Sequence, residues 1–298
     1  MIPIIDSHHH IWRQADLQWL QGPMQPRIFG PYEPLRRDYP VEEFRADLSG
    51  CGVVGSVYVQ ANWPQDRAVD ETAWVQAEAD RTGWPQAIVG YADMLSDDIT
   101  PTVRRLVSYP LTRGIRMQTH WHENPTYRFA ESPDVVADPR FRRNIRVLAA
   151  HSLSFDLQLF TSQMADAAAM VAANRDVTFI LQHAGMLEDL SPAGIAAWRE
   201  GMQRLAQEPN LTVKLTAFGT FIHRNDAAHI AFITGATVAL FGAERCMFGS
   251  NFPIEKLWTS YADLVDAHRA AVADMTPAAQ RSILHDTAAR VYRIDAGN

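Results

Sequence analysis

Eight short apolar segments alternate with segments of helical periodicity along the chain, and this alternation limits the possible folds more than any other feature. The apolar segments are rich in Val, Ile, Phe and Tyr, which is typical of strands buried on both faces of a parallel sheet. Eight strand–helix units indicate an α/β fold, a (β/α)8 (TIM) barrel. The open doubly wound alternative is disfavoured because no glycine-rich phosphate loop opens a helix. The expected strands are residues 4–10, 55–61, 87–93, 112–118, 154–160, 177–184, 211–217 and 246–251.

The segments between these strands carry the periodicity and the start signals of helices. Met164, Ala168 and Val171 recur at positions i, i+4 and i+7, on one face of a helix. Ser191 followed by Pro192 is typical of an N-cap and a first helical position. Both signals support the helical half of each strand–helix unit.

The whole chain, residues 1–298, is expected to form a single domain, because no linker, repeat or low-complexity tract divides it. Residues 13–40 interrupt the alternation, with several Pro and Trp residues and little periodicity. We expect a long loop after strand 1, and in a barrel such a loop covers the active-site face. It could cover a substrate or contact a second subunit, so a homo-oligomer remains open.

Composition excludes several classes of protein. Hydrophobic residues make up 47% of the chain and charged residues 20%, as in ordinary globular proteins. The formal net charge of -7 disfavours a nucleic acid or an anionic membrane as the main partner, although a pocket can still be locally positive for a small anionic substrate. No apolar stretch reaches transmembrane length, and the cysteines Cys51 and Cys246 suit a reduced compartment. A cytoplasmic location is therefore expected.

Three consecutive histidines end the first expected strand, in the stretch "IIDSHHHIW". Because a strand alternates its faces, His8 and His10 share one face, and His9 points away and packs behind the strand. The carboxyl end of a barrel strand is where such enzymes place their chemistry, and two imidazoles at i and i+2 can hold one metal ion. The alternative is a polar strand end that shows histidines to solvent. Two further histidines, His268 and His285, lie on apolar helical stripes and are expected at the edge of the core.

Two cations lie inside expected core strands. A guanidinium inside a barrel needs an anion, so Arg116 is expected either to bind a substrate carboxylate or to pair with Asp93 or Asp156. Lys214 on strand 7 needs a carboxylate or a substrate oxygen in the same way.

Other polar residues at the strand ends are candidates for substrate contacts. Tyr58, Gln60 and Asn62 alternate with apolar residues and could form a polar stripe that faces the barrel interior. The loop "THWHENP" after strand 4 contains His120 and His122, which could supply an acid or base or only hydrogen-bond the loop.

The opening "DSHHHIW" resembles the Asp-x-His-x-His-x-Trp start of the amidohydrolase superfamily, specifically its lactonase-rich branch. That branch includes 2-pyrone-4,6-dicarboxylate lactonase, 4-sulfomuconolactonase and sugar-acid lactonases. The stretches "GIRMQ", "LQHAG", "VKLT" and "CMFGSNFP" resemble its motifs on strands 4, 6, 7 and 8, and "DTAARVYRI" resembles its terminal helix. Each motif is weak alone, but their order and spacing extend the resemblance over the whole chain.

The resemblance implies roles for individual residues. His8, His10 and His183 would bind one divalent metal ion, zinc first, or form the polar core of the site in members that act without metal. A metal ion held by three neutral imidazoles keeps its charge and can acidify a bound water and polarise a lactone carbonyl. The catalytic candidates are thus His8, His10, His183, Lys214 and Asn251, and the substrate-binding candidates are Arg116, Gln60, His120, His122 and Trp12.

The sequence departs from the family pattern at the end of strand 8. The usual aspartate is replaced by Asn251, whose amide cannot accept a proton at neutral pH. Another group such as His120, His122 or Glu255 could be the base, a metal-bound water could be acidic enough, or the barrel could have left hydrolysis. Since a general base contributes about 10²–10⁴-fold, its loss is compatible with opening of a reactive ester.

Three functions remain open from the sequence. The first is a hydrolase that opens the ring ester of a small, carboxylated lactone in aromatic-acid or sugar-acid catabolism. The second is a non-oxidative decarboxylase of an aromatic or dienoic acid, although Ile-Trp after His10 resembles the lactonase branch. The third is a barrel that binds an acidic metabolite without turnover, which Asn251 favours and the retained polar set disfavours.

Overall fold

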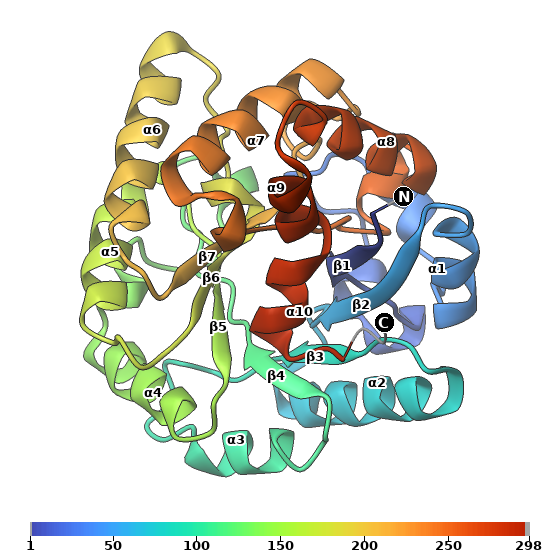
Figure 1. The fold of residues 1–298 in the computed structure, drawn as a ribbon. Helices are drawn as coiled ribbons and strands as arrows, with labels where there is room; N and C mark the ends of the chain where they lie inside the picture. Colours follow the sequence, from blue (N-terminus) through green and yellow to red (C-terminus); the bar gives the residue numbers. More distant parts are fainter. Residues whose placement is uncertain (1, 296–298) are drawn as a thin grey trace.

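A computed structural model describes residues 2–295, and within this range eight parallel strands form one sheet in the order β1 to β8 (Figure 1). Helices follow the strands in sequence and surround the sheet, which confirms the expected (β/α)8 barrel. The strands are β1 Ile4–His9, β2 Val53–Val59, β3 Ala87–Gly90, β4 Thr112–Ile115, β5 Ser154–Leu157, β6 Phe179–Leu181, β7 Leu211–Leu215 and β8 Cys246–Phe248.

The outer helices begin where the sequence signals place them. Ser191 caps α6, its hydroxyl accepting from the Gly194 N–H at 3.1 Å, with Pro192 in the first turn. The helices of the ring are α1 Val41–Asp47, α2 Ala68–Thr82, α3 Thr100–Leu106, α4 Pro139–Ala149, α5 Met164–Ala172, α6 Pro192–Ala206, α7 Ala227–Phe241 and α8 Tyr261–Val272. They are followed by α9 Pro277–Arg281, a π-helical turn Ser282–Asp286, and α10 Thr287–Tyr292.

The barrel closes between β1 and the segment that follows β8. The Asn251 N–H donates to the His8 carbonyl at 2.7 Å, and the His10 N–H donates to the Phe252 carbonyl at 2.8 Å. The buried Asp6 carboxylate reinforces this seam, because it accepts from both the N–H and the hydroxyl of Ser250, at 2.8 and 2.6 Å. Asp6 of the opening motif is therefore a structural residue that fixes the segment before Asn251.

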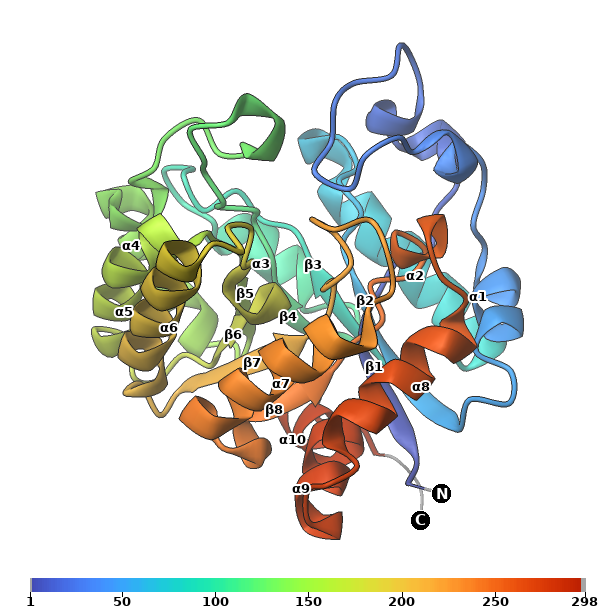
Figure 2. The same cartoon turned by 90° about the horizontal axis from the view of Figure 1, so that it is seen from above.

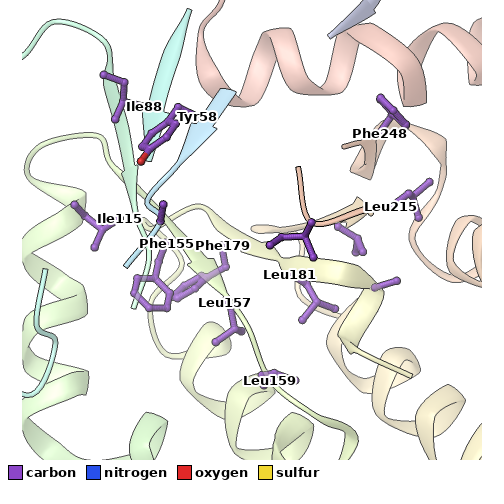
Figure 3. Close-up of a cluster of buried hydrophobic side chains, with 14 of the residues drawn as sticks. Tyr58, Ile88, Ile115, Phe155, Leu157, Leu159, Phe179, Leu181, Leu215 and Phe248 are labelled. Atoms are coloured by element: carbon purple, nitrogen blue, oxygen red, sulfur yellow. The ribbon is translucent and has the colours of Figure 1, made fainter. Parts of the chain in front are cut away.

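Alternate strand residues divide the core into two parts. Inward-facing Ile5, Val57, Val89 and Ile180 fill the barrel interior with Tyr292 of α10, which lies across the end where the strands begin (Figure 1). Outward-facing side chains pack between the strands and the helix ring, among them Ile88, Ile115, Phe155, Leu157, Phe179, Leu181, Leu215 and Phe248 (Figure 3). Each fully buried side chain of this kind contributes about 1.5–3 kcal/mol.

Within β2, the polar stripe expected on strand 2 does not face the barrel interior. Tyr58 points out of the barrel into the outer core (Figure 3), and its hydroxyl donates to Glu71 of α2 at 2.8 Å. Val57 and Val59 face the interior instead. An aromatic ring with one polar atom fits the helix-facing layer when a buried acceptor is present, which the alternation of strand 2 alone did not reveal.

The loops that follow the strands gather at the end opposite the termini. Figure 2 shows residues 13–40 and the loop after β4 rising on one side, and α9, α10 and both ends of the chain on the other. Residues 13–40 form a long loop as expected, with short 3₁₀ turns at Gln14–Asp16, Gln18–Leu20 and Glu33–Leu35. Within residues 2–295, no helix combines the length and the hydrophobicity needed to cross a bilayer.

Candidate active site

A cavity of about 480 Å³ lies at the carboxyl ends of the strands, between the long loop after β1 and the loops after β4 and β7. This is the end at which (β/α)8 enzymes place their active sites. The lining residues include His10, Trp12, Trp19, Arg27, Phe29, Asn62, Arg116, His120, Tyr127, Arg128, His183, Thr220 and Asn251.

Left-handed backbone aims several of these residues into the cavity. Asn62 after β2, His183 after β6, Ala217 after β7 and Asn251 after β8 have φ angles of 65°, 55°, 59° and 57°, and all four line the cavity. This conformation costs an ordinary residue about 1–2 kcal/mol, although Asn accepts it more readily. Strained residues of this kind concentrate at functional sites, which supports a working role for His183 and Asn251.

The three expected histidines meet at the floor of this cavity. The ring centre of His8 lies 5.1 Å from that of His10 and 5.0 Å from that of His183. Nδ1 of His10 lies 2.6 Å from the Val59 carbonyl oxygen, so it carries the proton and leaves Nε2 as an acceptor. His10 and His183 line the cavity, and His8 lies beneath them.

These histidines are neutral. Burial, together with the positive charges of Lys214 and Arg116, lowers the pKa values of His8 and His183 well below their usual range. Within the described part of the chain, Nε2 of His8 and Nδ1 of His183 are buried without hydrogen-bond partners. The three imidazoles at the floor of the cavity are therefore uncharged, and two of their nitrogen atoms have no hydrogen-bond partner among the described residues.

Two other histidines pack as core side chains, as expected. The His9 ring stacks on Phe44 of α1 with centres 3.9 Å apart, so the middle histidine of the triplet does lie behind the strand. His268 of α8 packs against Phe248, and burial lowers its pKa to about 3. Neither lines the cavity.

Arg116, directly after β4, brings a positive charge to the cavity. Its guanidinium donates to the Gln60 carbonyl and to Oε1 of Gln182, yet among residues 2–295 no carboxylate lies within ion-pair distance of it, and its Nε has no partner. Burial lowers its pKa to about 10, so it stays protonated at neutral pH. A buried guanidinium without an anion favours the substrate-carboxylate alternative over the structural ion pair.

Lys214, in contrast, forms an ion pair with a carboxylate of the protein. Its Nζ lies 2.6 Å from Oδ2 of Asp156, and both side chains are fully buried. Gln182 donates to the same Asp156 oxygen at 2.9 Å and lies 3.5 Å from Nδ1 of His8, so this pair supports the histidine floor from below. Lys214 does not line the cavity.

Of the four other residues expected to contact substrate, two line the cavity and two do not. Trp12 lines the cavity, with its Nε1 bound to the Arg37 carbonyl at 2.8 Å. Gln60 and His122 do not line it. The side chain of Gln60 accepts from the Asn62 N–H at 2.7 Å, and His122 lies 3.6 Å from Glu188. His120 does line the cavity, and burial lowers its pKa to about 3.

The long loop adds a cation that sequence reasoning missed. Arg27 lines the cavity beside Trp19, whose ring centre lies 6.0 Å from its guanidinium carbon. Within the range 2–295, three arginines (Arg27, Arg116 and Arg128) and no Asp or Glu line this cavity. The cavity is thus positive in a chain of net charge -7. A loop without periodicity gives no register, so the composition of "QPRIFG" was the only available signal.

The model of the family described as Amidohydrolase matches residues 5–294 of the chain. The chain belongs to the amidohydrolase family. An uncharacterized protein of Sinorhizobium fredii, y4mH, is 33% identical over 298 residues, covering 98% of this chain and 99% of that protein. An L-fucono-1,5-lactonase of Burkholderia multivorans is 28% identical over 306 residues, covering 97% and 96%. A solved structure of a Burkholderia multivorans amidohydrolase with bound zinc has a TM-score of 0.81 at 26% identity, covering 98% of this chain and 99% of that one.

These findings confirm the family expected from the motifs and its lactonase-containing branch. Because the family model spans nearly the whole barrel, the strand-end motifs correspond to one continuous family domain. This amidohydrolase is accordingly a hydrolase, as the sequence predicted.

The histidine set matches a metal ion in its chemistry and in the spacing of two ring pairs, but not as a complete ligand set. Neutral imidazoles are suitable ligands, and two imidazoles on one tetrahedral zinc have ring centres about 5 Å apart, as His8 has with each of its neighbours. Yet within residues 2–295, no three His, Cys, Asp or Glu side chains are grouped so that they could hold a metal ion. Asn251 also supplies no negative charge. The residues present therefore do not fit a metal centre.

Proposed function

We propose that this amidohydrolase opens the ring ester of a small anionic lactone. The observation that carries the proposal is the unpaired, buried guanidinium of Arg116 in a cavity lined by arginines and, within the described residues, by no acidic side chain. A lactone that bears a carboxylate, or hydroxyl groups that accept from Arg116, supplies the missing partner. Membership in a branch that contains L-fucono-1,5-lactonases supports the ester class.

The cavity suits a substrate of one ring. About 480 Å³ is the size of small-ligand pockets, and aromatic side chains form much of its outer wall, including Trp19, Phe29, Tyr127 and Phe221. Ring faces pack on such side chains, while Arg116 fixes the anionic group at the floor. The scissile carbonyl then faces the histidines.

Hydrolysis needs a nucleophilic water and a donor to the carbonyl oxygen. Nε2 of His10 is an acceptor, because Nδ1 donates to Val59, and it can orient the attacking water. His183 leaves Nδ1 without a partner, so we assign its proton to Nε2, from which it donates to the developing oxyanion. The water oxygen adds to the carbonyl carbon, and collapse of the tetrahedral adduct breaks the ring C–O bond. A hydroxy acid is released.

The test is hydrolysis by the purified chain of a matched panel of lactones. The panel pairs five- and six-membered lactones that carry a carboxylate with neutral lactones of the same ring, L-fucono-1,5-lactone among the neutral members, and acid release is followed with a pH indicator. We expect turnover, with kcat/KM higher for each anionic member of a pair. The Arg116→Gln variant should lose this preference, because it removes the charge and keeps a hydrogen-bonding side chain.

Other outcomes would overturn the proposal in distinguishable ways. Release of carbon dioxide from hydroxybenzoates without lactone opening would identify a decarboxylase. Binding of carboxylated lactones in calorimetry, with no product after prolonged incubation, would identify a binding barrel.

A further inference from the structure

Glu255 is a fully buried carboxyl group directly behind Asn251. It lies in the short 3₁₀ turn Glu255–Leu257 after β8, and 1% of its surface is exposed. Its Oε2 accepts from Nε1 of Trp258 at 2.8 Å, and its Oε1 is buried without a hydrogen-bond partner in residues 2–295. A buried carboxylate oxygen that no core contact uses requires an explanation, because leaving it unpaired costs about 1–3 kcal/mol or more.

Thr220 stands between this carboxyl group and the cavity. Thr220 lines the cavity from the loop after β7 and is 5% exposed, and its hydroxyl has no hydrogen-bond partner in the described residues. Its side chain and that of Asn251 face Glu255 closely enough to lower the carboxyl pKa, although neither makes a well-formed hydrogen bond there. Gly219 allows the Glu255 carboxyl to lie against the backbone next to Thr220, since a Cβ at position 219 would lie 2.6 Å from Oε2 of Glu255.

We propose that Glu255, acting through the Thr220 hydroxyl, replaces the carboxylate that Asn251 removed from the end of strand 8. The inference rests on the proposed lactone hydrolysis and names the group that takes the proton of the attacking water. Glu255 is a positioning residue in this scheme, because Thr220 is the group that faces the substrate water. Asn251 holds the water by hydrogen bonds without changing its own protonation.

One proton moves from the attacking water to Glu255 and returns to the ring oxygen of the lactone. As the water oxygen bonds to the lactone carbonyl carbon, one water proton passes to Oγ1 of Thr220, and the Thr220 proton passes to the Glu255 carboxylate. When the ring C–O bond breaks, the ring oxygen takes a proton back along the same path. Glu255 is then ionised again, and the hydroxy acid product carries both parts of the added water.

The scheme predicts activity that rises with pH. Burial raises the pKa of Glu255 to about 8, so the ionised form that accepts the proton increases through that region. The groups in contact with its carboxyl, from the loops after β7 and β8, are uncharged. On the elements packed around it, Lys256 is held by Glu43 and Asp47 of α1, His223 lies against Trp258, and His10 of β1 lines the same cavity as Asn251. His223 packs against Trp258, a hydrogen-bond partner of Glu255, so the pH profile should also be recorded in His223→Asn.

The first experiment is a rescue series measured by kcat, KM and pH profile on the lactone that wild type opens fastest. Glu255→Gln should lower kcat by about 10²–10⁴-fold with little change in KM, and should remove the rise near pH 8. Adding Asn251→Asp, which returns a carboxylate to strand 8, should restore most of kcat with a pH profile at lower pH. Thr220→Val should behave like Glu255→Gln, and Thr220→Ser should not.

The matched control is Glu71→Gln. Glu71 is also 1% exposed, its pKa is raised to about 7 by burial, and it binds the Tyr58 hydroxyl outside the cavity. This variant should retain the rise in rate near pH 8, whatever its stability. An unchanged pH profile in Glu255→Gln, or no recovery on adding Asn251→Asp, would overturn the relay while lactone hydrolysis stands.

A second measurement does not depend on turnover. Infrared difference spectra of wild type minus Glu255→Gln, between about pH 5 and pH 10, follow the protonated carboxyl band of Glu255. Because the Thr220 side chain lowers the pKa of the Glu255 carboxyl, Thr220→Val should raise the midpoint of this titration, and Thr220→Ser should leave it near the wild-type value. An identical midpoint in Thr220→Val would overturn the relay even if wild type opened no lactone.

Discussion

Two hollows share one rim at the carboxyl end of the barrel, and they differ in the sign of their charge. The inner cavity carries Arg27, Arg116 and Arg128 and, in the described residues, no acidic side chain. The outer hollow, of about 850 Å³, lies over the loops after β2, β3 and β4. Its charged lining residues are Asp93, Glu131, Asp134, Asp138 and Arg140. Both are lined by Gln18, Asn62, Gln118 and Phe129.

The comparison shows that the volume of a hollow does not decide which of the two is the candidate active site. The outer hollow is the larger one, but its charged side chains lie near solvent, as where Arg140 pairs with Asp138 at 2.9 Å with the arginine side chain 48% exposed. The inner cavity rests on a charge pair that is fully buried, Lys214 with Asp156. Solvent screens the first pair and not the second, so only the inner cavity holds a strong, fixed field.

The largest expected effect breaks the buried pair. Lys214→Met leaves the Asp156 carboxylate buried and unpaired, which should lower the free energy of unfolding by about 3–5 kcal/mol. The matched change in the outer hollow, Arg140→Gln, should have a far smaller effect on the free energy of unfolding, because exposed ion pairs contribute little. Urea unfolding of both variants measures the difference. Similar losses of unfolding free energy in the two variants would show that the two regions do not differ as argued. The double variant Lys214→Met, Asp156→Asn should recover part of the stability that Lys214→Met loses.

The next effect tests the charge that faces the substrate. Arg116→Gln removes a buried charged hydrogen-bond donor, so kcat/KM for carboxylated lactones should fall by about 100-fold. Neutral lactones of the same ring should lose less, because they offer no anion to the guanidinium. Equal losses on both would mean that Arg116 supports the fold of the cavity rather than the substrate.

A smaller effect is expected at the cavity mouth. Arg27 is only partly buried, so Arg27→Gln should lower kcat/KM for anionic lactones by about 3–10-fold, and the effect should shrink at high salt. Arg67→Gln is the control, since Arg67 also lies over a tryptophan ring, that of Trp63, but lines neither hollow. An equal loss in the control would mean that Arg27 acts only through the general surface charge and not through its place in the cavity.

The barrel could be predicted from the sequence because its cause is local. Each apolar run predicted one strand, and the alternation of faces predicted that His8 and His10 share one face and that His9 packs behind the strand, where its ring stacks on Phe44. The strand ends could not be predicted. The sixth strand was expected over 177–184 but ends at Leu181, because His183 turns into left-handed backbone without a glycine to signal it.

The sequence predicted a residue of the site only where that residue lay on an expected strand or in a recognisable motif. The partner of Lys214 lies 58 residues away on β5, and nothing in the sequence chose between Asp156 for Lys214 and Asp156 for Arg116. Glu255 was one of three possible bases, and its burial behind Asn251 became visible only in the fold. Arg27 was missed because its loop has no periodicity. Long-range pairing, rather than local pattern, decides all three.

The smallest expected effect is that of metal removal. Arg116 and Lys214 against Asp156 already leave the floor with an excess positive charge, and a divalent ion would add to it with no carboxylate from Asn251 to offset it. Elemental analysis of chain purified without chelators or added metal should find far less than one ion per chain. Dialysis against a chelator should leave lactone opening unchanged. One tightly held zinc per chain, with activity lost on its removal and regained on its return, would show that the histidines rearrange around an ion and that the positive charge of the inner cavity does not exclude one.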